Sequence, residues 1–128
     1  MAKRILQIVE SAYRGTLEEQ DDTVVWISHA MKGAGADIGV LLRGAAVNYA
    51  VRGQDASGLA FGAKRQTQPP RVAEDLAALV AKGVEVRFIE EDAQERGVAR
   101  SELVEGIIPL RSAELPRLLE TYDQVWCW

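Results

Sequence analysis

The chain has 128 residues, of which 48% are hydrophobic and 27% charged, and its formal net charge is −4 at pH 7. This length suffices for one domain with a hydrophobic core and is too short for two of ordinary size, so we expect a single domain over residues 1–128. The scattered basic residues exclude the clustered Lys and Arg of a nucleic-acid interface, and no apolar run approaches the roughly 20 residues of a membrane span.

Residues that bind metals or form disulfides are scarce. Cys127 is the only cysteine and His29 the only histidine. One cysteine rules out an internal disulfide, which fits a reducing compartment, and a structural metal site would need carboxylates for most of its ligands. We therefore expect no metal and no cofactor, and we expect a cytoplasmic protein.

The first predicted element is a strand at residues 5–9. Its apolar stretch is shorter than the roughly 7 to 15 residues of a signal-peptide core. The following turn, ESAYRGTLEEQ, contains Tyr13 and Arg14 as candidate ligand-binding residues. The carboxylates near the next helix start would repel a phosphate, and a polar turn is the simpler interpretation of this segment.

A helix is predicted over residues 16–32. Thr16 and Glu19 have the spacing of a capping box, and Gly33 follows the last residue as a helix stop. The glycines of the segment GAGADIG therefore close a helix and precede a strand. A dinucleotide fingerprint follows a strand and opens a helix, so we expect no dinucleotide site here.

This predicted helix has an unusually wide apolar face. The residues spaced to form its core stripe are Val24, Ile27 and Met31. Val25 and Trp26 extend the apolar surface beyond that stripe, so we expect another subunit to bury them. His29 lies off the stripe and has no serine or cysteine motif to activate, which favours a surface or interface histidine.

The other elements alternate between strand and helix patterns. They are a strand at 38–42, a short helix at 44–51, an irregular loop at 52–70, a helix at 72–82, a strand at 84–89, a strand at 107–110, a helix from about Ser112 and a strand at 125–128. Apolar strands in this alternation are typical of a parallel sheet buried on both faces. The sequence therefore predicts an α/β fold, a three-layer α/β/α domain with a five-stranded parallel sheet.

The segment VEVRFIEEDAQERGV follows a predicted central strand, at whose carboxyl end ligands gather in open α/β sheets. Glu90, Glu91, Asp92 and Glu95 form an acidic cluster there. Such a cluster is commonly a solvated helix start that the helix dipole favours. The alternative is a binding site for a cation or a basic partner segment, with Arg96 as a further ligand-binding residue.

The order of these segments resembles the DsrE/DsrF family, small α/β proteins that include the sulfur-relay subunits TusB, TusC and TusD. The matching segments are KRILQIVESA, GVLLRGAAVNYAVRGQ, LAALVAKGVEVRFIEEDAQERGV and TYDQVWCW. The resemblance implies a five-stranded parallel sheet and assembly into trimers or hexamers. The implied partners are other subunits of a homo- or hetero-oligomer, including sulfur-relay proteins. The charge and the apolar runs, as stated above, predict neither a nucleic-acid nor a membrane partner.

The chain departs from the family at the residue that carries sulfur. Sulfur-transferring members resemble V-x-V-C-x-x-[SC]-x-x-x-R-G, with the cysteine carrying a persulfide after the third strand. Arg96 and Gly97 match the end of this pattern, whereas Ile89 stands at the cysteine position and Asp92 at the second one. Neither side chain can carry sulfane sulfur, so the resemblance implies a binding or partner subunit.

Two alternative functions remain open. One is a sulfurtransferase or sulfur carrier that uses Cys127. In a strand, Val125 and Cys127 share one face, and a covering helix would make Cys127 a small core residue, which is the interpretation we favour. The other alternative is an enzyme in which Glu90, Glu91 or Asp92 acts as a general base, and it requires a carboxyl group with a raised pKa.

Overall fold

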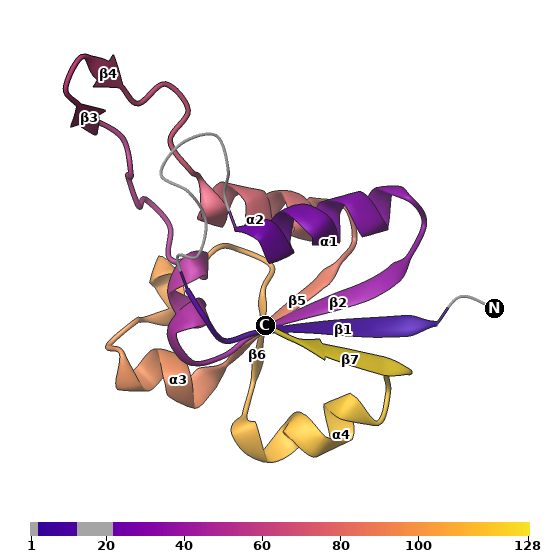
Figure 1. Ribbon diagram of the computed structural model, residues 1–128. Coiled ribbons are helices and arrows are strands. Elements are labelled where there is room, and N and C mark those ends of the chain that lie inside the picture. The colour runs from indigo at the N-terminus through magenta and orange to yellow at the C-terminus, as the bar shows by residue number, and fades with distance from the viewer. Residues whose placement is uncertain (1–2, 13–21) are drawn as a thin grey trace.

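Five parallel strands form the main sheet of the computed structural model, which describes residues 3–12 and 22–128. The strands are β1 (Arg4–Val9), β2 (Asp37–Leu42), β5 (Glu85–Ile89), β6 (Ile108–Leu110) and β7 (Gln124–Cys127). They lie in the order β6-β5-β2-β1-β7, with β6 and β7 at the two edges (Figure 1). All five predicted strands are confirmed to within one residue at each end.

Helices cover both faces of this sheet, as the α/β prediction requires. One face carries α1 (Thr23–Gly33) and α2 (Val72–Ala81), and the opposite face carries α4 (Leu115–Leu119), while α3 (Glu90–Glu95) follows β5 (Figure 1). Among residues 3–12 and 22–128, three 3₁₀ turns lie in the connections: η1 (Gly44–Ala50), η2 (Arg100–Glu102) and η3 (Ser112–Glu114). None of the helices in the described part of the chain has the length and apolar character that crossing a bilayer requires.

The start of α1 differs from the prediction. Asp22 has an extended backbone (φ −81°, ψ 135°), and its carboxylate accepts hydrogen bonds from the backbone of Val24 and Val25. Asp22 is therefore the N-cap of a helix that begins at Thr23, because an N-cap carboxylate satisfies the free N–H groups of the first turn. The predicted capping residues, Thr16 and Glu19, lie outside the described residues.

Apolar clusters fill the space between the sheet and the helices on both faces. The cluster under α1 and α2 includes Val9, Val24, Val25, Val40, Leu42, Leu76, Leu79, Val86 and Phe88. The cluster under α4 consists of Leu6, Ile8, Leu41, Ile89, Leu110, Leu118 and Tyr122. Because both faces of the central strands are covered, these strands are continuous apolar runs rather than alternating ones.

The part of the apolar face of α1 that lies outside the core is smaller than predicted. Val25 is only 1% exposed and belongs to the core of its own subunit, so the expectation that another subunit buries it is wrong. The reason is that α2 packs beside α1 and widens the buried stripe of that helix. Trp26 does lie outside the core, with 62% of its surface exposed.

Part of the predicted irregular loop is an antiparallel hairpin that projects from the body of the molecule (Figure 1). Its strands are β3 (Ala60–Phe61) and β4 (Lys64–Arg65), and Gly62 adopts a φ of 61° in the turn between them. A left-handed conformation of this kind favours glycine, which has no Cβ to clash. Both strands are exposed, including Phe61.

Candidate functional site

The predicted ligand residues of α3 lie at the carboxyl ends of three neighbouring strands. Glu91 accepts hydrogen bonds from the backbone N–H of Ser112 (3.0 Å) and from its hydroxyl (2.7 Å), which ties α3 to the segment after β6. Asp92 accepts a hydrogen bond from the backbone N–H of Gly44 (2.7 Å), at the start of η1 after β2. These two carboxylates therefore hold together the connections that follow β2, β5 and β6.

The other charged residues of this segment have partners of their own. Glu90 forms an ion pair with Arg100 (3.6 Å). Arg96 donates a hydrogen bond to the backbone carbonyl of Asp92 (3.1 Å) and lies 4.0 Å from the carboxylate of Glu95. Within residues 3–12 and 22–128, no three His, Cys, Asp or Glu side chains are grouped so that they could hold a metal ion.

The environment of Glu91 does not suit a general base. The hydrogen bonds from the hydroxyl and the backbone of Ser112 hold the pKa of this carboxyl below its ordinary 4.5. A general base needs a pKa near the working pH, and a carboxylate of lowered pKa is a weak proton acceptor. Because the pKa of Glu91 is lower in the folded chain, its hydrogen bonds to Ser112 also stabilise the fold. This stabilisation is present above the ordinary pKa of the carboxyl and is lost as the pH falls through the lowered pKa.

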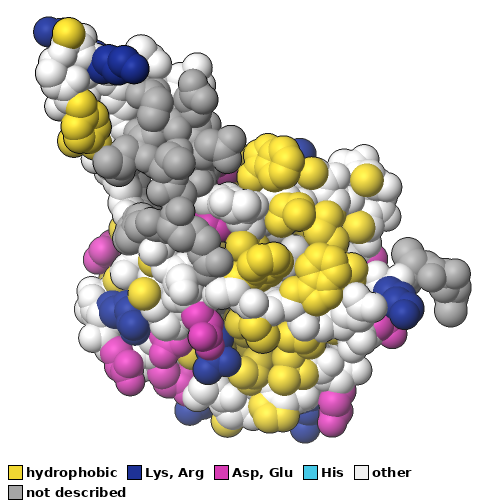
Figure 2. All heavy atoms as spheres, viewed as in Figure 1, with side chains coloured by type: hydrophobic (Ala, Val, Ile, Leu, Met, Phe, Trp, Pro, Cys, Tyr) yellow, Lys and Arg dark blue, Asp and Glu magenta, His cyan; other side chains and the backbone are white. Residues whose placement is uncertain are grey.

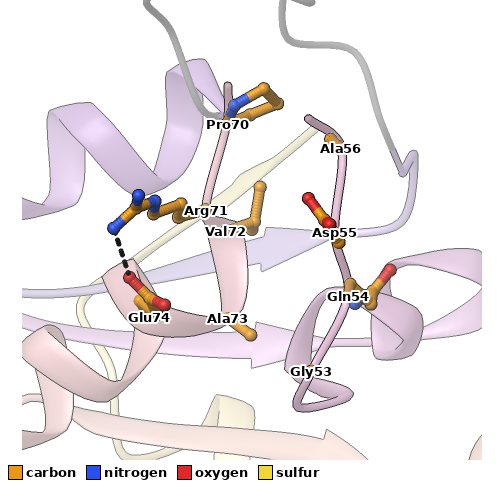
Figure 3. Close-up of a pocket in the computed structure, with 9 residues that line it drawn as sticks. All are labelled: Gly53, Gln54, Asp55, Ala56, Pro70, Arg71, Val72, Ala73 and Glu74. Atoms are coloured by element: carbon orange, nitrogen blue, oxygen red, sulfur yellow. Dashed lines mark ion pairs between the residues drawn. The ribbon is translucent and has the colours of Figure 1, made fainter. Parts of the chain in front are cut away.

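A surface pocket of about 180 Å³ lies between the loop after η1 and the start of α2 (Figure 3). Its walls are formed by residues 53–56 and 70–74, and Arg71 forms an ion pair with Glu74 (3.6 Å) at its rim. Asp55 accepts a hydrogen bond from the backbone of Ser57 (2.9 Å), and the hydrogen bonds from Ser57 lower the pKa of this carboxyl. Sequence reasoning missed this pocket because it treated the whole segment as irregular.

Tyr13 and Arg14, the other predicted ligand residues, lie outside the described residues.

Ile89 is the last residue of β5 and is buried. It is 4% exposed and packs in the cluster under α4 with Leu41 and Leu110. A side chain at this position is therefore surrounded by apolar groups on the sheet face rather than presented to a ligand. The position that carries sulfur in the resembling family is here part of the core.

Cys127 is exposed, so the interpretation of this residue as a core side chain is wrong. It lies on β7, an edge strand whose residues are all exposed. The helix on its side of the sheet, α4, has five residues and packs over the central strands through Leu118, so it leaves β7 uncovered. Period-2 alternation predicted which residues share a face, but not whether a helix covers that face.

His29 is half-buried between two helices of the same subunit. Its Nε2 lies 2.9 Å from the backbone carbonyl oxygen of Asp75 and therefore donates a hydrogen bond to it. This bond joins α1 to α2 and accounts for the histidine without a catalytic role.

Exposed apolar side chains gather along the β7 edge of the molecule. The large exposed side chains of this segment, which we call the β7 surface, are Val125, Trp126 and Trp128, and Trp26 is exposed on α1. Figure 2 shows a band of apolar side chains over α1, β7 and α4 on this side. Trp128 is held in place by a hydrogen bond from its Nε1 to Oε1 of the fully buried Gln7 (2.6 Å). Large exposed apolar patches are common at interaction sites, so this band is a candidate contact surface.

The fold and the site together define a small α/β protein with a DsrE-like fold and an isoleucine at the end of its third long strand. No family model and no curated protein matches the chain. It is similar in structure to the ychN protein of E. coli, with a TM-score of 0.73 and 19% sequence identity over 100% of both chains.

Two proteins of unknown function share the fold. BT1422 of Bacteroides thetaiotaomicron has a TM-score of 0.63 and 15% identity, over 97% of this chain and 94% of its own. MTH1491 of Methanobacterium thermoautotrophicum has a TM-score of 0.60 and 14% identity, over 97% of this chain and 98% of its own. At identities of 19% or less, these similarities establish the fold and not the activity.

Proposed function

We propose that this protein is a DsrE-like subunit of an oligomeric assembly, related to the cytoplasmic sulfur-relay subunits, that binds a partner or small ligand without carrying sulfur after its third long strand. Ile89 is the observation that carries the proposal, because a buried alkyl side chain at this position offers no nucleophile for persulfide formation. The DsrE-like fold supports the relation to sulfur-relay proteins. The residues of α3, which join three strand ends, are the proposed contact site together with Tyr13 and Arg14.

The exposure of Cys127 favours a second candidate function, that of a sulfur carrier. In this chemistry the Cys127 thiolate attacks the terminal sulfane sulfur of a persulfide donor. A new sulfur–sulfur bond forms on Cys127, and the donor leaves as a thiolate. Access is the first requirement of such a transfer, and an exposed edge strand provides it.

Mass spectrometry after incubation with a sulfane-sulfur donor separates these two functions. A binding or partner subunit is expected to show no stable gain of sulfur, because the only thiol has no carrier role. A sulfur carrier would gain one sulfur atom on Cys127, and Cys127→Ser would abolish that gain. Reduction with dithiothreitol is the control, since it removes a persulfide sulfur but leaves an irreversible oxidation product unchanged.

The assembly is tested through Trp26. Trp26→Glu is expected to yield smaller species in light scattering, because it places a charge on an apolar surface that a second subunit would cover. The matched control is Phe61→Glu, since Phe61 is similarly exposed (67%) but lies on the projecting hairpin. A wild-type monomer at micromolar concentration would contradict the oligomeric part of the proposal.

A further inference from the structure

The two edges of the main sheet differ in how they resist pairing with another strand. The β6 edge contains Pro109, and proline at an edge has no N–H to donate to an added strand. The β7 edge consists of Gln124, Val125, Trp126 and Cys127, without proline, glycine or charge. All four are exposed, so the two commonest chemical barriers to pairing, proline and charge, are absent from this strand.

The main-chain groups of β7 are directed alternately toward β1 and away from it. Trp128 donates its N–H to the carbonyl of Ile8 (2.9 Å), and its carbonyl accepts from the N–H of Glu10 (2.9 Å). In a parallel ladder every second residue bonds to the same neighbour, so Trp126 also faces β1. Val125 and Cys127 therefore direct their N–H and C=O groups to the side where the described residues provide no further strand.

We propose that this edge pairs with the β7 edge of a second copy of the chain, antiparallel about a two-fold axis at Trp126. In this register Val125 of each copy exchanges two backbone hydrogen bonds with Cys127 of the other. The interface is one contact within the oligomer proposed above, and it rests on that proposal. A two-fold contact of this kind gives a closed assembly an even number of subunits.

A second copy fits this edge because the strand is complementary to itself. Two uncharged strands meet without the repulsion that like charges produce when they are directly opposite. The axis places Trp126 opposite Trp126 in a non-hydrogen-bonded pair, in which side chains approach closely and aromatic pairs are favourable. Trp128 lies on the same face of the sheet as Trp126. Trp126 is the register partner of Gln7 on β1, and the indole of Trp128 donates its hydrogen bond to the Gln7 side chain.

Disulfide trapping tests the register directly. The double variant Trp126→Cys/Cys127→Ser places one thiol of each copy at the axis, where the Cα atoms of such a pair lie about 4.5 Å apart. That separation is within the range of roughly 4.4 to 6.8 Å found in disulfides. Under mild oxidation we expect most of the chain to become a covalent dimer on a non-reducing gel.

Two control variants share the Cys127→Ser background. Ile108→Cys places a thiol of similar exposure on the proline-containing edge, where the exposed fractions are 39% for Ile108 and 36% for Trp126. Gln124→Cys places it on β7 but two residues from the axis. Both are expected to remain uncrosslinked, and equal crosslinking of all three variants would overturn the proposal as random collision.

A second variant keeps the test independent of thiol chemistry. Trp126→Lys opposes two positive charges at the axis and is expected to halve the particle mass in light scattering, with an unchanged circular dichroism spectrum. An unchanged particle mass would overturn the edge pairing. If the chain is oligomeric but does not crosslink at position 126, the proposed edge pairing is wrong and the proposed oligomeric function is not affected. A wild-type monomer would contradict both the edge pairing and the oligomeric function.

Discussion

Replacement of Asp22 by alanine is expected to lower the free energy of unfolding by about 3 kcal/mol. The carboxylate is 1% exposed, and its Oδ1 accepts hydrogen bonds from the backbone N–H groups of Val24 (2.8 Å) and Val25 (3.3 Å). Its Oδ2 accepts a hydrogen bond from the hydroxyl of the fully buried Tyr49 (2.5 Å). Alanine removes both the helix cap and the acceptor of a buried hydroxyl. Urea unfolding followed by circular dichroism measures the change.

Two related variants separate these contributions. Asp22→Asn retains a side-chain oxygen that can cap α1, so it is expected to lose less than half as much stability as Asp22→Ala. Tyr49→Phe removes only the bond between η1 and the cap, and its effect should be less than additive with that of Asp22→Ala, because the two residues share one contact. A loss below about 1 kcal/mol for Asp22→Ala would contradict this role for the carboxylate.

Gly39→Ala is expected to destabilise the protein by about 2 kcal/mol through a steric clash. A Cβ on Gly39 would lie 2.1 Å from the hydroxyl oxygen of Tyr122 and 2.9 Å from its Cζ. The ring cannot easily move aside, because the Arg4 guanidinium lies 4.5 Å over its centroid and Arg87 donates a hydrogen bond to its hydroxyl (3.4 Å). Thermal and urea unfolding of the variant measure the loss.

The matched control is Gly33→Ala. A Cβ on Gly33 would meet nothing within 4 Å, and this residue ends α1 without a left-handed backbone. Because alanine restricts the unfolded chain more than glycine does, this variant should be neutral or slightly stabilised. Tyr122→Leu should relieve part of the clash in Gly39→Ala. Equal stabilities of the two alanine variants would show that Tyr122 does not confine Gly39.

The sequence predicted the strands better than it predicted what surrounds them. Apolar runs bounded by turns located all five strands of the main sheet to within one residue. The hairpin of β3 and β4 was not predicted, because strands of two residues are too short to show an alternation of apolar and polar side chains. The sequence predicts an earlier start for α1 because Thr16 and Glu19 match a capping box, whereas the structure uses Asp22 as the cap.

The errors about the site share one physical cause. A period of two or of 3.6 residues reports which side chains share a face, but the order of strands in a sheet depends on contacts between distant segments. The local pattern predicts a core position for Cys127 because nothing local marks β7 as an edge strand. It predicts an interface position for Val25 because the packing of α2 beside α1 cannot be inferred from α1 alone. For Glu91 and Asp92, the acidic cluster was visible in the sequence, whereas their partners Ser112 and Gly44 were not.

The position of β7 beside β1 has a kinetic consequence. The hydrogen bond between Trp128 and Gln7 joins residues 121 positions apart, so docking of β7 closes a loop almost as long as the chain. Pairing of β1 with β2, and of β2 with β5, closes much shorter loops, and we expect these pairs to form first. The contacts of β7 would then be absent from the folding transition state. Weakening them should speed unfolding and leave the refolding rate nearly unchanged in stopped-flow experiments, so this last strand would set the lifetime of the folded chain.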